Sequence, residues 1–100
     1  MREVTRRLVE VADPVRVVLF GSHASGTAGA DSDLDILVVE RSLGSAVAEM
    51  ARLRRAVGRI GIPVDILVCS EQEAADWGHL PGTALYWALR EGKVLYEAAR

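Results

Sequence analysis

The strongest constraint on the fold is a pair of identical apolar runs, each headed by an aspartate. They are Asp35-Ile36-Leu37-Val38 and Asp65-Ile66-Leu67-Val68. Short, uninterrupted apolar runs rich in β-branched residues are typical of buried strands. A helical pattern separates the two runs, and a strand, helix and strand in succession normally form a right-handed parallel crossover. We therefore expect neighbouring parallel strands, with Asp35 and Asp65 side by side at one edge of the sheet.

The remaining pattern completes an α/β (α+β) fold, a small mixed sheet flanked by helices. A capping box at Ser70 and Glu73 predicts the start of one short helix. Hydrophobic periodicity, Gly and Pro positions and β-branched runs predict the other elements. We predict helices over 1–12, 43–60 and 81–91, and strands over 15–20, 33–39, 64–68 and 94–96. The predicted order is αβ(loop)βαβααβ, and the apolar stripe of the long middle helix includes Leu43, Val47, Leu53 and Ile60.

Length and composition limit the class of protein. One hundred residues suit a single domain over residues 1–100. A formal net charge of −2 gives no support to non-specific nucleic-acid binding, which depends on neutralising several phosphates. Cys69 is the lone cysteine, and no apolar stretch approaches the ~18 residues of a membrane span. We expect a soluble, cytoplasmic protein that contacts neither membrane nor nucleic acid directly.

A third carboxylate joins the two that head the apolar runs. Asp33 lies two residues before Asp35, so strand alternation places both side chains on one face. A single aspartate at a strand start is most often solvated, but three in one patch repel one another by about 4 kcal/mol per pair at 4 Å. Such a cluster favours a bound cation, and Mg²⁺ prefers carboxylate and phosphate oxygens. We therefore consider Asp33, Asp35 and Asp65 candidate metal ligands.

The segment 21–32, GSHASGTAGADS, is a small, polar connection between two predicted strands. If the strand before it runs antiparallel to the strand after it, Gly21 and Ser22 reach the same edge as the acids. Backbone N–H groups and the Ser22 hydroxyl could then bind phosphates. The segment is not a Walker loop, since Thr27 stands where lysine is required, and it is not a dinucleotide fingerprint. Together with the acids, it predicts phosphoryl or nucleotidyl transfer.

These residues carry a family resemblance. Gly21-Ser22, ten residues and then Asp33-Leu34-Asp35, within LFGSHASGTAGADSDLDILVV, closely resemble the signature of the DNA polymerase β-like nucleotidyltransferase superfamily. The likeness continues through the third acid in VDILV and through PGTALYWALREGKVLYE, so it covers nearly the whole chain. The chain is similar to the minimal members of this superfamily.

The resemblance implies transfer of AMP from ATP onto a hydroxyl, with pyrophosphate leaving. Asp33 and Asp35 match the acids that hold two Mg²⁺ ions, and Asp65 matches the third acid, which assists deprotonation of the attacking hydroxyl. Gly21 and Ser22 match the pair that binds the triphosphate at the start of a helix. Two metal ions ~3.5–4 Å apart can stabilise both the attacking and the leaving oxygen.

Free-standing minimal domains of this kind resemble the antitoxin (MNT) half of HEPN/MNT toxin–antitoxin pairs, which adenylylates its HEPN ribonuclease toxin. One departure concerns catalysis: such domains often carry arginine in the segment where this chain has His23 and Ser25. Arg41 or Lys93 would have to supply the missing positive charge.

Alternatives remain open at this point. The chain could be a catalytically weak or inactive antitoxin that blocks its partner by contact alone, or an aminoglycoside-type nucleotidyltransferase. The clustered acids favour an enzyme, since a pure binder has no use for mutually repelling carboxylates. We expect a partner surface on the aromatic residues near the C-terminus, and a homodimer or hetero-oligomer is possible. These aromatic residues are Trp77, Tyr86, Trp87 and Tyr96.

Overall fold

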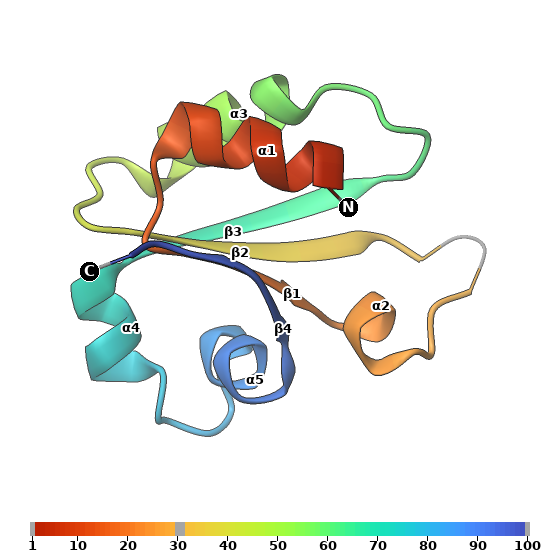
Figure 1. Ribbon diagram of the computed structural model, residues 1–100. Coiled ribbons are helices and arrows are strands. Elements are labelled where there is room, and N and C mark those ends of the chain that lie inside the picture. Colours follow the sequence, from red (N-terminus) through yellow and green to blue (C-terminus); the bar gives the residue numbers. More distant parts are fainter. Residues whose placement is uncertain (1, 30–31, 100) are drawn as a thin grey trace.

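The computed structural model describes residues 2–29 and 32–99, which form a four-stranded mixed sheet with helices on both faces (Figure 1). The predicted fold class is confirmed, and the element order matches the prediction apart from the helical turn α2 within the predicted loop. In chain order the elements are α1 (Arg2–Ala12), β1 (Arg16–Phe20), α2 (Ser22–Ser25), β2 (Leu34–Glu40), α3 (Ala46–Val57), β3 (Val64–Ser70), α4 (Glu71–Trp77), α5 (Ala84–Glu91) and β4 (Lys93–Glu97).

The strand order is β3-β2-β1-β4, and its registers decide what meets at the sheet edge. β2 and β3 are parallel, with Asp35 directly opposite Asp65. β1 and β2 are antiparallel, with Phe20 opposite Asp35. The end of β1 and the starts of β2 and β3 therefore lie at one edge, as the sequence predicts. The repeated Asp-Ile-Leu-Val runs are consequently aligned residue for residue.

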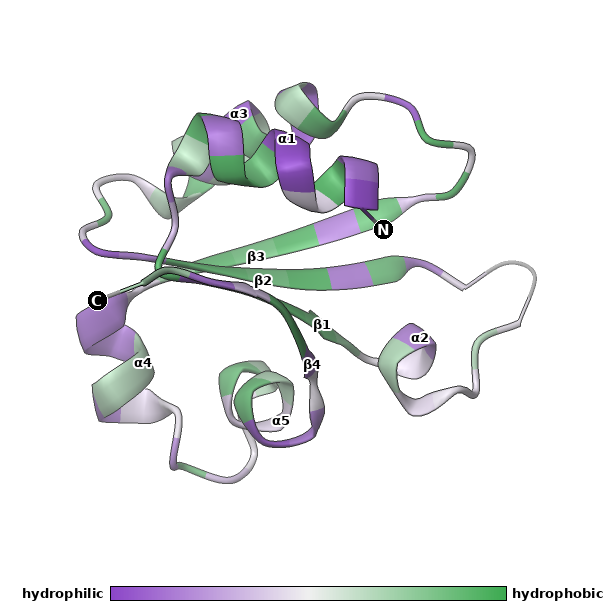
Figure 2. Ribbon diagram, viewed as in Figure 1, coloured by the Kyte–Doolittle hydropathy of each residue, from purple (hydrophilic) through white to green (hydrophobic). Residues whose placement is uncertain are grey.

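Two apolar layers hold this edge in place. α1 and α3 cover one face of the sheet, and α4 and α5 cover the other (Figure 1). The first layer is built on Leu8, Ile36 and Leu53, and the second on Leu37 and Ala88, all at most 1% exposed. Figure 2 shows the central strands as predominantly hydrophobic, interrupted by a hydrophilic segment near the start of β2 and of β3.

Helix α3 differs from its prediction. It spans Ala46–Val57 rather than 43–60, because the Ser45 side chain caps it by accepting from the Ala48 backbone N–H, and Gly58 ends it at a φ of 67°. Leu43 and Ile60 therefore lie outside the helix. Val47 is 73% exposed, so its predicted place in the apolar stripe is wrong. It lies about a third of a turn away from Leu53 around the helix.

The predicted loop 21–32 contains the single helical turn α2, which begins where the family resemblance implies the start of a helix. Its residues are small and polar, and they give no hydrophobic period from which a helix could be predicted. Among the described residues, no helix combines the length and the apolar character needed to cross a membrane.

Candidate active site

Three carboxylates act on one another at the sheet edge. Asp35 is the second residue of β2, Asp33 is exposed just before that strand, and Asp65 is the second residue of β3. Burial raises the pKa of Asp35 above its ordinary value, and the charges of Asp65 and then Asp33 raise it further. The structure therefore brings the three predicted acids into one electrostatic field, on the sheet face that α4 and α5 cover.

Gly21 brings the backbone close to these acids. A Cβ at this position would lie 2.3 Å from Oδ2 of Asp35, and the φ of Gly21 is +73°. Both features require glycine, because an L side chain would be strained in this conformation and would collide with the carboxylate. The chain can therefore turn from β1 into α2 directly beside Asp35.

The first turn of α2 leaves polar groups available at this turn. The backbone N–H groups of Ala24 and Ser25 donate to the Gly21 carbonyl, both at 3.1 Å. The first N–H groups of a helix have no acceptor within the helix. The Ser22 hydroxyl makes no hydrogen bond with any residue that the structure describes. Gly21 and Ser22 thus lie where the sequence predicts, with hydrogen-bonding groups open to a ligand.

His23 belongs to the site, although the sequence analysis assigned it no role there. Its Nε2 lies 3.1 Å from the backbone oxygen of Ser32, so it connects α2 to the residue before Asp33. Its charge acts on Asp35 in the opposite sense to the acids and lowers the pKa of that carboxyl. His23 therefore connects the turn at Gly21 to the segment that carries the acids.

Arg54 of α3 also lies at the site, and the sequence did not indicate it. Its guanidinium lies 3.8 Å from Oδ1 of Asp65, and both side chains are 63% exposed. β3 is the outermost strand of the sheet, so the Arg54 side chain can reach past its unpaired side, from the face covered by α3 to the face that carries Asp65. No local pattern in the sequence signals it, because it depends on how α3 lies against β3.

The two other cations considered from the sequence lie elsewhere. Arg41 follows the far end of β2 and donates to the Asp13 backbone oxygen at 3.3 Å, so it is at the wrong edge to assist the acids. Lys93 pairs with Leu19 in register and so lies at the correct edge. By alternation, however, Lys93 shares the face of Leu19 and Leu95, opposite that of Asp35.

The donor set of this edge suits a hard cation. All three acids offer carboxylate oxygens, and burial first, then the charges of Asp65 and Asp33, raise the pKa of Asp35. Among the described residues, no three His, Cys, Asp or Glu side chains converge into a preformed metal site. Mg²⁺ typically takes one or two carboxylates and completes its coordination with water and substrate phosphates.

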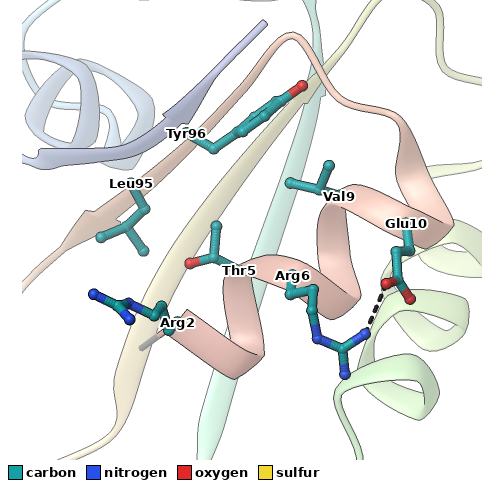
Figure 3. A pocket seen from close by; sticks show the side chains of 7 residues that line it. All are labelled: Arg2, Thr5, Arg6, Val9, Glu10, Leu95 and Tyr96. Carbon is teal, nitrogen blue, oxygen red and sulfur yellow. Dashed lines mark hydrogen bonds and ion pairs between the residues drawn. The ribbon is translucent and has the colours of Figure 1, made fainter.

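A cavity lies away from the acids, between α1 and the edge strand β4 (Figure 3). It measures about 770 Å³, with Val9, Leu95 and Tyr96 among its lining residues. A bulge in β4 directs the last two toward α1 together, since Val94 and Tyr96 pair with successive residues of β1 and Leu95 pairs with none.

The aromatic residues expected to form a partner surface are therefore divided. Tyr96 lines the cavity beside α1. Trp77 and Trp87 are 55% and 51% exposed and belong to α4 and α5, on the other face of the sheet (Figure 1). Tyr86 contacts Trp87 edge to face, with ring centroids 5.1 Å apart. The predicted single surface of four aromatic residues is not present.

Comparison with known families identifies the class of protein. Residues 1–85 match the nucleotidyltransferase domain family, and the chain belongs to that family. The match includes the Gly21-Ser22 turn and the three acids, so the family and the geometry of the sheet edge concern the same part of the chain. A search of curated proteins gives no significant match.

Solved structures of low sequence identity share the fold. One is a toxin–antitoxin crystal structure with AMP-PNP, at 19% identity and TM-score 0.71, covering 97% of this chain and 73% of the other. A nucleotidyltransferase described as putative, from Sulfolobus solfataricus, has 21% identity and TM-score 0.66, over 96% and 76% of the two chains.

A third is the spectinomycin adenyltransferase AAD(9) from Enterococcus faecialis with ATP and spectinomycin, at 20% identity and TM-score 0.70. That match covers 99% of this chain but only 55% of the other, so the present chain spans about half of that enzyme.

Proposed function

We propose that this chain is a Mg²⁺-dependent nucleotidyltransferase that transfers AMP from ATP to a hydroxyl of a partner protein. The observation that carries the proposal is the pairing of Asp65 with Asp35 on adjacent strands, with Gly21 beside Asp35 directly after the next strand, β1. This order offers metal ligands in the centre and phosphate-binding groups on one side. It leaves the other side for an acceptor.

Each residue of the edge has a separate role in the proposed transfer. Asp33 and Asp35 would hold two Mg²⁺ ions, with Asp65 assisting one of them, and the ions would stabilise the charge that develops on the phosphoryl group. The open N–H groups after Gly21 and the Ser22 hydroxyl would bind the triphosphate. The acceptor oxygen would form a bond to the α-phosphorus while the bond to the bridging oxygen breaks. Pyrophosphate would leave, and the hydroxyl proton would pass to Asp65.

For the partner, we propose a toxin protein of the HEPN ribonuclease type, with this chain as its antitoxin in the cytoplasm. The fold shared with the AMP-PNP-bound toxin–antitoxin structure supports this proposal, as does the resemblance to minimal antitoxin domains. An aminoglycoside acceptor is the alternative suggested by the fold shared with the spectinomycin enzyme, over 55% of the chain of that enzyme.

The second candidate function is that of an antitoxin with little or no catalysis, which blocks its partner by contact. His23 and Ser25 favour it, because neither supplies a guanidinium for the phosphates. Asp33 and Asp35, which have no ion-pair partner among the described residues, favour the enzyme, since a binder has no need of such acids.

The two candidates are separated by a labelling experiment. The purified chain is incubated with Mg²⁺ and α-labelled ATP in lysate of its own source, and label is followed into protein bands. We expect a labelled band that disappears with Asp33→Asn and with Asp35→Asn. Co-purification of a helical partner that carries no label would instead establish the binder.

A further inference from the structure

A cleft of about 440 Å³ lies beside the third acid, between the end of α3 and the start of β3. Its walls are apolar and include Ile60, Ile62, Pro63 and Val64. Arg54 and Arg59 also line it. The residue that follows Val64 is Asp65, and Arg54 lies 3.8 Å from the carboxylate of that residue. The cleft therefore opens next to the candidate active site.

The cleft carries excess positive charge. Arg59 makes no ion pair with any described residue, and Arg54 has Asp65 as its one described ion-pair partner. The end of α3 would normally repel anions through its free carbonyl groups. Here, however, the Arg7 guanidinium donates to the Val57 backbone oxygen, while its charge is paired with Glu3, so the excess positive charge of the cleft is that of Arg59. An acidic ligand with apolar side chains matches these walls and charges.

The strand order decides which substrate this ligand belongs to. Asp65 and Gly21 lie on opposite sides of Asp35, because β3 and β1 flank β2. In an in-line transfer, the attacking and leaving oxygens lie on opposite sides of the phosphorus. If Gly21 and Ser22 bind the triphosphate, as proposed above, the pyrophosphate leaves on their side. The acceptor then approaches from the side of Asp65 and the cleft.

We propose that this cleft binds an acidic, apolar segment of the partner protein next to its acceptor hydroxyl, with Arg54 and Arg59 as specificity-determining residues. The inference rests on the proposed function and adds to it the chemistry by which the acceptor is selected. Arg54 also lies 3.8 Å from the carboxylate of Asp65, so an acceptor bound to Arg54 would lie next to the third acid.

The test is peptide binding measured by fluorescence anisotropy, with Mg²⁺ and AMP-PNP present so that no transfer occurs. The probe is a short labelled peptide in which glutamate and leucine alternate around a central serine. In a second peptide glutamine replaces every glutamate. The variants are Arg59→Gln, which leaves the Arg54–Asp65 pair intact, and the double variant with Arg54→Gln. Arg55→Gln is the matched control, because this exposed α3 residue does not line the cleft.

We expect the acidic peptide to bind at least tenfold more tightly than the glutamine peptide. Arg59→Gln should weaken its binding several-fold and the double variant at least tenfold, while Arg55→Gln changes it less than twofold. Equal effects of Arg55→Gln and Arg59→Gln would overturn the inference, as would equal binding of the two peptides or no binding of either. AMP-PNP binding is followed in the same samples. Its absence contradicts the proposed function, whereas intact nucleotide binding without dependence on Arg59 contradicts the cleft alone.

Discussion

Strand β2 carries a carboxylate of raised pKa at each end, but the surroundings of the two carboxylates differ. At the start, burial and the charges of Asp65 and Asp33 raise the pKa of Asp35. At the other end, burial raises the pKa of Glu40 to about 7, together with its hydrogen bond to Glu49 and the charge of that group. Like charges are thus brought together twice in one strand.

The difference lies in what compensates each pair. Glu49 is held by Arg52 through two hydrogen bonds of 2.7 Å, which lower its pKa to about 2, and Glu40 is only 8% exposed. That end is closed, and Arg52 compensates Glu49 from within the protein, but the buried Oε2 of Glu40 has no hydrogen-bond partner among the described residues. Asp35 is partly exposed, and no described cation is hydrogen-bonded to it. Clustered acids therefore indicate a ligand site only where the protein leaves them open and uncompensated.

The largest expected effect comes from Asp35→Asn. Removing this ligand should lower nucleotide transfer by about 100- to 1,000-fold, the cost of one missing charge-stabilising group. The free energy of unfolding should stay the same or rise, because the repulsion from Asp65 and Asp33 is lost. Label transfer and thermal unfolding measure the two effects. Glu40→Gln at the other end of β2 is the control, and loss of transfer there as well would erase the distinction between the ends.

Gly21→Ala tests the close approach of backbone and carboxylate. Backbone strain and the collision with Asp35 should lower the free energy of unfolding by about 1–3 kcal/mol, and nucleotide binding should weaken. Gly26→Ala is the matched control, because Gly26 has a similar φ of +80° and nothing within 4 Å of an added Cβ. Chemical denaturation of both variants gives the comparison. Equal effects on nucleotide binding would assign the loss to strain alone.

The Glu40→Gln variant tests the far end of β2 through the pH dependence of the free energy of unfolding. The pKa of Glu40 is raised from 4.5 to about 7 in the folded state, so the folded state binds the proton more tightly than the unfolded state. The free energy of unfolding should therefore fall as pH rises from about 4.5 to 7 and remain lower above that range. The variant should lack this decrease and be about 2 kcal/mol more stable at pH 8. Urea denaturation at pH 5 and pH 8 measures it, and parallel curves would contradict the assignment.

The smallest effect is stabilisation by ligands at the open end. Mg²⁺ with ATP should raise the unfolding temperature more than the sum of their separate effects, since they share ligands. A tenfold excess over Kd contributes about 1.4 kcal/mol. Differential scanning fluorimetry with the wild-type chain and Asp35→Asn measures the synergy. A magnesium effect that does not depend on ATP would speak against a shared site.

Much of this geometry follows from the sequence because it depends on short-range patterns. The repeated Asp-Ile-Leu-Val runs predict the parallel register that places Asp35 beside Asp65. The length of the segment between Gly21 and Asp33 permits β1 to pair antiparallel with β2, which brings Gly21 to the same edge. Contacts between distant elements carry no such signal. The Arg54–Asp65 pair, the hydrogen bond of His23 to Ser32 and the Glu40–Glu49 cluster depend on tertiary packing, so the sequence does not reveal them. The predicted burial of Val47 is wrong because repeated three-residue spacings drift around an α-helix, so Val47 lies about a third of a turn from Leu53.

The central claim is that the open end of β2 binds metal and nucleotide. Crystals grown with Mn²⁺ in place of Mg²⁺ and with AMP-PNP test it most directly, because manganese is located by its anomalous scattering. We predict anomalous density between Asp33 and Asp35, with the triphosphate against Gly21 and Ser22. Nucleotide bound elsewhere, for example in the cavity between α1 and β4, or at the edge without metal, would contradict the account.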